Sequence, residues 1–159
     1  RALARELPSA YALRIAKKKA EKVGKQNENS FVLAADTVVA CGRRIMPKAE
    51  TEAEANSCLN LLSGRRHKVL GAVVIYSPNG TQIYRVVKSV VTFKKLTQEE
   101  INFYLKTREW EGKAGGYAIQ GLAATYIRAL NGSYSNVVGL PLYETYQMLR
   151  GMGFKYKVP

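Results

Sequence analysis

The run from Phe31 to Cys41, FVLAADTVVAC, is apolar along almost its whole length and is bounded by residues that favour turns. Apolar, β-branched runs of this length are typical of strands buried in a sheet. The run therefore predicts a buried strand, and it holds one acid, Asp36, near its middle. An acid at a buried position has to be ion-paired, protonated or bound to a cation. The same segment thus bears on the fold and on a candidate site.

Helical and extended patterns alternate along the rest of the chain. Alanines and other apolar residues recur at helical spacing near the start, and two Thr-x-x-Glu sequences are typical of capping boxes that open helices. The turn Ser77–Gly80 indicates an antiparallel pair, so we expect an α/β fold with a mixed sheet rather than a doubly wound one. The expected elements are helices over 8–25, 51–63, 97–107 and 142–150, and strands over 31–41, 68–76, 82–94 and 123–130.

The length of 159 residues predicts a single domain with a sizeable core. No apolar run approaches the roughly 20 residues of a membrane helix, and the basic start of the chain lacks the apolar core of a signal peptide. Cys41 and Cys58 have no metal-ligand spacing around them, so we expect both to be reduced and buried. These features predict a cytoplasmic protein that has no membrane partner.

The formal net charge of +13 is compatible with three interpretations. The excess serves nucleic-acid binding, attracts a small polyanion such as a nucleoside triphosphate, or lies on solvated faces. Aromatic residues are not interleaved with basic ones as a nucleic-acid stacking platform requires, so nucleic acid is not an expected partner. Lysines at 17, 18, 19, 22 and 25 share one early helix and are assigned mostly to solvated faces.

The segment from Gly112 to Thr145 places Lys113 and Gln120 among several glycines. Glycines let a backbone approach a ligand closely, and a lysine beside them suits a phosphate. Uracil and thymine present an imide N–H beside carbonyl oxygens, which complements a side-chain amide, whereas cytosine inverts part of that pattern. Gln120 is therefore a candidate reader of the base. A mobile surface loop, or a glutamine that only ties down its own loop, are the alternatives.

Asp36 is a candidate ligand for a hard cation or a candidate general base, because Mg²⁺ prefers one or two carboxylates plus substrate phosphates. The alternative is an aspartate that is hydrogen-bonded to neighbouring backbone. Thr37 lies beside it and is expected to support the site. Lys48 follows Pro47, which stiffens its loop, although an isolated lysine is more often a surface residue.

Three other residues have weaker signals. Tyr117 either stacks on a base or packs in the core, and the sequence leaves both open. Glu144 lies near the start of the last expected helix, where it is interpreted as a structural cap. His67 opens a strand, so a hydrogen-bonded structural role is favoured over catalysis. One histidine and two scattered cysteines do not make a zinc site, and the GxxxxGK[ST], GxGxxG and GxSxG motifs are all absent.

Several longer segments agree in order with one known family. They are AKKKA at 16–20, ADTVV at 35–39, Lys48 after Ile45-Met46, LSGRRHKV at 62–69, VTF at 91–93, KAGGYAIQG at 113–121 and GSYSNVVGLPL at 132–142. On these segments the chain resembles the Maf proteins, which are septum-formation-inhibitor-like nucleoside triphosphate pyrophosphatases. The similarity runs through the whole chain.

The resemblance implies a metal-dependent enzyme that splits a nucleoside triphosphate into the monophosphate and pyrophosphate. It implies a curved mixed sheet flanked by helices, as in the inosine triphosphatases, with a cleft between two lobes, and a homodimer. The KAGGYAIQG form is similar to the branch that acts on dTTP and UTP. Asp36 would hold Mg²⁺ or Mn²⁺, and Lys48 and Lys113 would neutralise the leaving pyrophosphate. Thr37, Tyr117 and Gln120 are expected to bind the substrate. A catalytically weak nucleotide-binding regulator of cell division is the alternative function.

The resemblance also shows departures. Members of the family begin with a strand, a Ser-x-Ser-Pro-Arg-Arg loop and an acidic segment that carries a catalytic glutamate, and residues 1–159 start after all three. Pro47-Lys48-Ala49 stands where Gly-Lys-Pro is usual, and Ser89 stands where threonine is frequent. We therefore expect one domain over residues 1–159 that lacks the family's N-terminal strand and loop.

Overall fold

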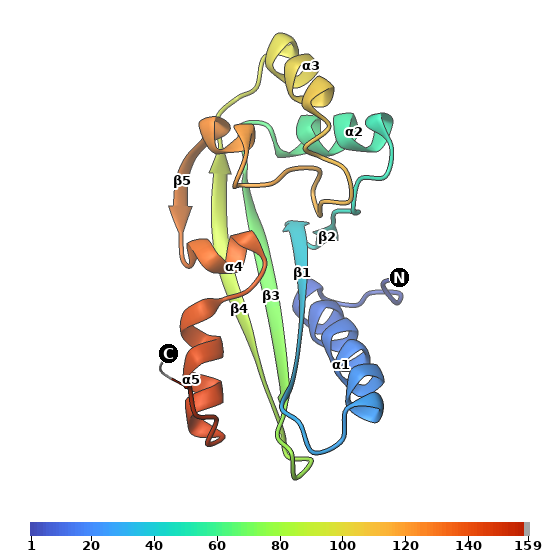
Figure 1. The fold of residues 1–159 in the computed structure, drawn as a ribbon. Helices are drawn as coiled ribbons and strands as arrows, with labels where there is room; N and C mark the ends of the chain where they lie inside the picture. The colour runs from blue at the N-terminus through green and yellow to red at the C-terminus, as the bar shows by residue number, and fades with distance from the viewer. Residues whose placement is uncertain (158–159) are drawn as a thin grey trace.

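A computed structural model describes residues 1–157 of the chain. It confirms the predicted α/β class, with helices on a single sheet (Figure 1). In chain order the elements are α1 (Pro8–Gln26), β1 (Val32–Cys41), β2 (Arg44–Ile45), α2 (Glu52–Leu62), β3 (Arg66–Tyr76), β4 (Gln82–Phe93), α3 (Gln98–Thr107), the 3₁₀ helix η1 (Leu122–Tyr126), β5 (Ile127–Asn131), α4 (Tyr134–Val138) and α5 (Leu142–Gly151).

The five-stranded sheet has the order β2-β1-β3-β4-β5. Each of its four pairings is antiparallel within the described residues, so the sheet does not combine parallel and antiparallel neighbours. The expected hairpin forms between β3 and β4 through the turn at Ser77–Gly80, a short link of the kind that antiparallel neighbours allow. The long β3–β4 ribbon runs through most of the molecule (Figure 1).

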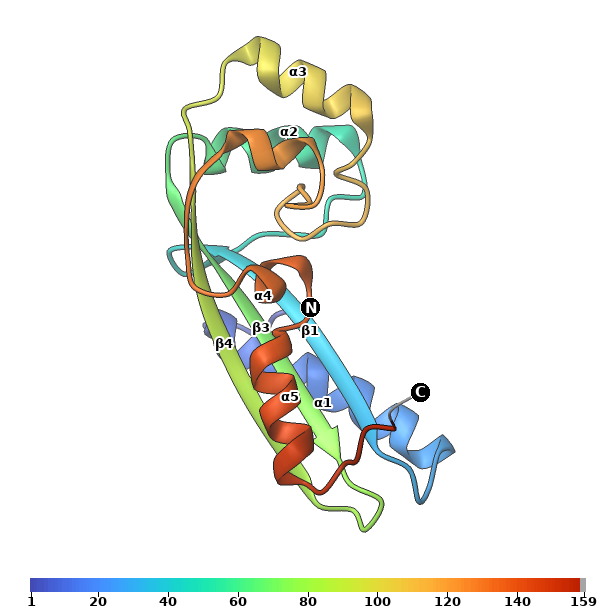
Figure 2. The same cartoon turned by 60° about the vertical axis from the view of Figure 1, so that its left-hand side comes forward.

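The two faces of the sheet are covered by different helices. On β3, Leu70, Ala72 and Val74 pack against the buried alanines of α1, whereas Val73 and Ile75 pack near Met148 of α5. Successive side chains of a strand point to opposite faces, so α1 and α5 lie on opposite sides of the sheet (Figures 1 and 2). At one end of the ribbon, α2 and α3 cover a third and larger apolar cluster.

Both Thr-x-x-Glu sequences lie at the N-termini of helices, α2 and α3. Thr97 and Glu100 form both halves of the expected capping box at the start of α3. At α2, Thr51 accepts from the backbone N–H of Glu54, but the Glu54 carboxylate reaches the N–H of Glu50 instead of that of Thr51. The predicted box there is therefore only half formed.

The expected strand over 123–130 is wrong in its first half. Residues Leu122–Tyr126 form η1, and β5 starts only at Ile127. The stretch contains the small residues Ala123 and Ala124, and the Ala124 N–H donates to the Gly121 carbonyl in a turn. The ring of Tyr126 at its end is buried. The two-residue β2 and the five-residue α4 were not predicted, because both are too short to show a hydrophobic period.

Several smaller predictions have outcomes in the described residues. Both cysteines are free, with Cys58 buried and Cys41 partly buried. Within residues 1–157, no helix combines the length and apolar character needed to cross a bilayer. The cytoplasmic location stays a prediction. The single-domain boundaries also stay a prediction, and residues 158–159 lie outside the described part.

Candidate active site

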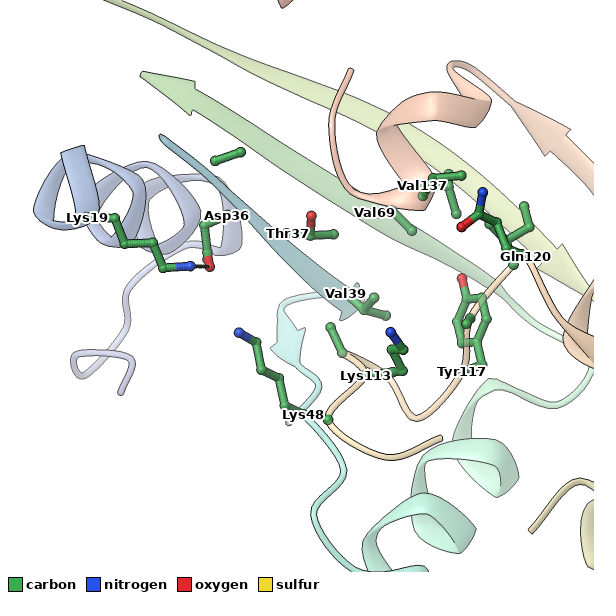
Figure 3. A pocket seen from close by; sticks show the side chains of 16 residues that line it. Lys19, Asp36, Thr37, Val39, Lys48, Val69, Lys113, Tyr117, Gln120 and Val137 are labelled. Atoms are coloured by element: carbon green, nitrogen blue, oxygen red, sulfur yellow. Dashed lines mark hydrogen bonds and ion pairs between the residues drawn. The ribbon is translucent and has the colours of Figure 1, made fainter. Parts of the chain in front are cut away.

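A cleft of about 300 Å³ brings together all six residues that the sequence analysis proposed for the site. Its lining comes from α1, β1, the loops around Lys48 and Lys113, and α4 (Figure 3). Three lysines and one aspartate line it, so positive charge predominates. The proposed residues in its lining are Asp36, Thr37, Lys48, Lys113, Tyr117 and Gln120.

Asp36 is buried in β1, with 7% of its surface exposed, and it is ion-paired. The Nζ atom of Lys19, on α1, lies 2.9 Å from its Oδ1 atom. This pair confirms that the buried acid needs a partner, but the partner is a lysine side chain and not neighbouring backbone. The Lys19 side chain is 48% exposed, so the pair is open to the cleft and is not sealed in the core.

Lys19 corrects the assignment of the early lysines to solvated faces. Its signal was available in the sequence: the buried alanines at 12, 16 and 20 define the face of α1 that meets the sheet, and Lys19 stands three residues after Ala16. Lys17 also departs from that assignment, since its Nζ atom lies 4.5 Å from the ring centroid of Tyr84. Lys18, Lys22 and Lys25 are exposed as expected.

Asp36 and Thr37 point to opposite faces of β1 because they are consecutive in a strand. In the register with β3, Asp36 lies opposite Ala72 on the α1 side, and Thr37 lies opposite Gly71 on the α4 side. The Thr37 hydroxyl donates to the carbonyl of Gly139 at 3.4 Å, which links β1 to the end of α4. The cleft is lined by both residues, so it reaches around the outer edge of β1.

Lys48 and Lys113 are far apart in the sequence but are joined through their backbones. They belong to two loops that form an isolated β-bridge between Lys48 and Ala114. The bridge consists of two backbone hydrogen bonds, from Ala49 N–H to the Lys113 carbonyl at 3.1 Å and from Gly115 N–H to the Pro47 carbonyl at 3.0 Å. A third, from Gly112 N–H to the Ala49 carbonyl at 2.8 Å, reinforces it. Lys48 and Lys113 thus line the same cleft as Asp36 from two joined loops (Figure 3).

Position 115, in the loop that carries Lys113, requires glycine. Its φ is +72°, and a Cβ atom there would lie 2.9 Å from Cγ1 of Val39 on β1. The loop backbone therefore lies directly against the strand that carries Asp36. A mobile surface loop, the alternative to a binding loop, does not describe this packed segment.

Tyr117 packs in the core below the cleft and leaves 5% of its surface exposed. Its hydroxyl lies 2.5 Å from Nε2 of His67, and both rings meet Phe93 edge to face. Burial lowers the pKa of His67 to about 4, which keeps the ring neutral and fits the structural role expected for it. Tyr117 exposes little of its ring to a bound base, so it supports the cleft from the core and is not a stacking platform.

Gln120 is exposed and lines the cleft at the far side from Lys19 and Asp36 (Figure 3). Val137 and Val138 of α4 complete the lining, and sequence reasoning missed both because α4 itself was missed. Glu144 lies in the first turn of α5 but makes no capping hydrogen bond, and its Oε1 atom is buried without a partner among the described residues. Its position in the first turn agrees with the structural role at the start of this helix, although no side-chain hydrogen bond caps the helix.

The donor atoms of the cleft offer a divalent cation one acidic side chain. No group of three or more histidine, cysteine or acidic side chains that could hold a metal occurs in residues 1–157. Asp36 supplies one hard carboxylate beside a cationic wall, and Lys19 bonds only its Oδ1 atom. A single carboxylate with substrate phosphates is a donor set that Mg²⁺ accepts, so the residues fit a cation that arrives with a phosphorylated ligand.

Comparisons with known proteins identify the family of the chain. A family model described as Maf-like protein matches residues 1–152. A dTTP/UTP pyrophosphatase of Paramagnetospirillum magneticum is 58% identical over 149 residues, which are 94% of this chain and 78% of the relative. A dTTP/UTP pyrophosphatase of Granulibacter bethesdensis is 65% identical over 125 residues, 79% of this chain and 59% of the relative. A nucleoside triphosphate pyrophosphatase of Ehrlichia canis is 52% identical over 147 residues, 92% of this chain and 77% of the relative.

Proposed function

Because this chain belongs to the Maf-like proteins, we propose that it is a hydrolase that converts dTTP and UTP to the nucleoside monophosphate and pyrophosphate. The observation that carries the proposal is the cleft, where Lys19, Lys48 and Lys113 surround a single buried carboxylate. Such a cleft attracts a polyanion and retains one acid for chemistry. The alternative of a catalytically weak regulator of cell division is not favoured, because the similar proteins are named as pyrophosphatases.

The charged residues of the cleft take different parts in the reaction. Hydrolysis joins the oxygen of water to the α-phosphorus and breaks the bond to the bridging oxygen, which leaves with pyrophosphate. Lys48 and Lys113 stabilise the negative charge that develops on this leaving group. Asp36 positions the attacking water, and Lys19 keeps the Asp36 carboxylate oriented.

Asp36 is also the residue that would hold a divalent cation, for which Mg²⁺ and Mn²⁺ are our candidates. When bound, such a cation polarises phosphoryl oxygens and lowers the pKa of a bound water. The resemblance implies a glutamate as a second acid, from a segment that family members carry before the region matched by residue 1. Experiments on the activity use the full-length protein.

Gln120 is our candidate for recognition of the base. With Gln120→Glu we expect the preference for UTP over CTP to fall by about tenfold or more, because a carboxylate has no N–H to donate to the O4 carbonyl of uracil. Initial rates of pyrophosphate release from dTTP, UTP and CTP measure this preference. Gln147→Glu on α5, which lies outside the cleft, is the control. Unchanged ratios in the Gln120 variant would assign the glutamine to loop structure alone.

We propose further that two copies of the chain pair through α4 and α5. Copies that each carry a net charge of +13 repel one another, so a shared surface has to be poor in charge. The exposed faces of these helices meet that need with large apolar and aromatic side chains, namely Tyr134, Leu142, Tyr143 and Tyr146. We expect sedimentation to give twice the monomer mass, and Tyr143→Glu to give the monomer. A monomeric wild type would contradict the proposal.

A further inference from the structure

We propose that Glu109 is a positioning residue for base selection, which holds Gln120 in place through the backbone that follows it. The inference rests on the proposed function, because it takes Gln120 as the reader of the pyrimidine. Glu109 does not line the cleft, so it acts through the loop and not by touching the substrate.

The first observation is a hydrogen bond behind the loop. The backbone N–H of Leu122 donates to Oε1 of Glu109 at 3.1 Å, across thirteen positions in the sequence. A hydrogen bond to an ionised acceptor is stronger than one between neutral groups, and this one is partly buried. It fixes the chain two residues after Gln120.

The second observation is the space at Gly121. A Cβ atom on this residue would lie 1.8 Å from Oε1 of Glu109, well inside the contact distance of any real pair of atoms. The carboxylate therefore occupies the room that every other residue type would need at position 121. Gly121 and Glu109 form one tight unit directly beside the glutamine.

The third observation is a matching contact on the other side of Gln120. The backbone N–H of Ala118 donates to the hydroxyl of Tyr104 at 3.2 Å, and Tyr104 is fully buried on α3. Gln120 is thus bracketed by Ala118 and Leu122, both of which are held by side chains from the end of α3 and the turn after it.

That turn is itself rigid. The N–H of Glu109 donates to Oγ1 of Thr107 at 3.2 Å, and Oγ1 of Thr107 donates to the Tyr104 carbonyl at 2.6 Å. The indole N–H of Trp110 donates to the Leu105 carbonyl at 2.9 Å. In a chain this basic, none of the four ion pairs within residues 1–157 includes Glu109, so the contact that the structure gives its carboxylate is the loop backbone.

The test measures binding, so that it does not depend on catalysis. The probes are α,β-methylene UTP and α,β-methylene CTP, and isothermal titration gives the two affinities for each variant of the full-length protein. With Glu109→Ala we expect the preference for the UTP analogue over the CTP analogue to fall about tenfold, because the loop loses a charged hydrogen bond. With Glu109→Gln, whose amide oxygen still accepts from Leu122, we expect a preference within about threefold of wild type.

Two controls separate positioning from general damage. Glu111→Ala removes an exposed acid of the same turn that pairs only with Arg108 among the described residues, and we expect no change in preference. In a Gln120→Ala background, Glu109→Ala should have no further effect on preference, which is the signature of action through the glutamine. Thermal melting of each variant checks that it folds.

The outcomes are distinguishable. If Glu109→Ala folds and keeps the wild-type preference, or if Glu111→Ala loses as much, the inference is overturned. A wild type that binds both analogues equally also overturns it, since no selectivity exists for Glu109 to support. A wild type that binds selectively but releases no pyrophosphate would contradict the proposed function and leave the positioning role standing on the binding data.

Discussion

Asp36→Asn should lower kcat/KM for pyrophosphate release from dTTP by about 10²–10³-fold, as expected when one charged group at a reacting centre is lost. Asparagine keeps the shape of the side chain but is a poor ligand for a hard cation and a poor partner for Lys19. Because Lys19 is half exposed, water replaces the lost partner and the melting temperature should change little.

The control for this variant is Glu28→Gln, which removes one negative charge from an exposed position beyond the end of α1. It should retain wild-type kinetics. If Asp36→Asn folds normally and still releases pyrophosphate at a near-normal rate, the buried acid of β1 has no part in the reaction.

Gly71→Ala should destabilise the protein by about 2–4 kcal/mol, from overpacking together with the loss of buried hydrogen bonds. A Cβ atom at this position of β3 would lie 1.9 Å from Oδ1 of Asn136, the buried residue at the centre of α4. Asn136 has no freedom to move aside, since its Nδ2 atom bonds the carbonyls of Val69 and Val87 and the hydroxyl of Ser89.

Urea unfolding of wild type, Gly71→Ala and Gly24→Ala compares their free energies of unfolding. Gly24 lies inside α1, and a Cβ atom added there would have no heavy atom within 4 Å, so alanine should stabilise by up to about 1 kcal/mol. Equal stability of Gly71→Ala and wild type would show that α4 is not anchored through Asn136. We also expect Gly71→Ala to bind nucleotide more weakly, because Val137 and Val138 of α4 line the cleft.

The fold was predictable where the signals are local. The capping residues of α3, the apolar run of β1 and the turn at Ser77–Gly80 each determine structure within a few residues, and the structure has all three. The start of β5 was not predictable in this way. The stretch after Gly121 is as apolar as a strand, and only the packing of Tyr126 near Tyr104 shows that it is a 3₁₀ turn.

For the candidate site too, the residue types could be predicted from the sequence but the long-range contacts could not. Residue chemistry was enough to single out Asp36, Lys113 and Gln120, and the family resemblance added Lys48; all four line one cleft. The contacts that assemble them are long-range: the bridge between the Lys48 and Lys113 loops, the pair of Lys19 with Asp36, and the support of Leu122 by Glu109. No local pattern encodes such contacts, because they depend on which strand or loop lies beside another in the folded chain.

The central claim is that this cleft directs water to the α-phosphorus of a pyrimidine nucleoside triphosphate. Hydrolysis of dTTP by the full-length protein with Mg²⁺ in water enriched in heavy oxygen, followed by mass spectrometry of both products, tests it most directly. We expect the heavy oxygen in dTMP and none in pyrophosphate. Heavy oxygen in pyrophosphate or in free phosphate, or the absence of dTMP, would contradict the claim.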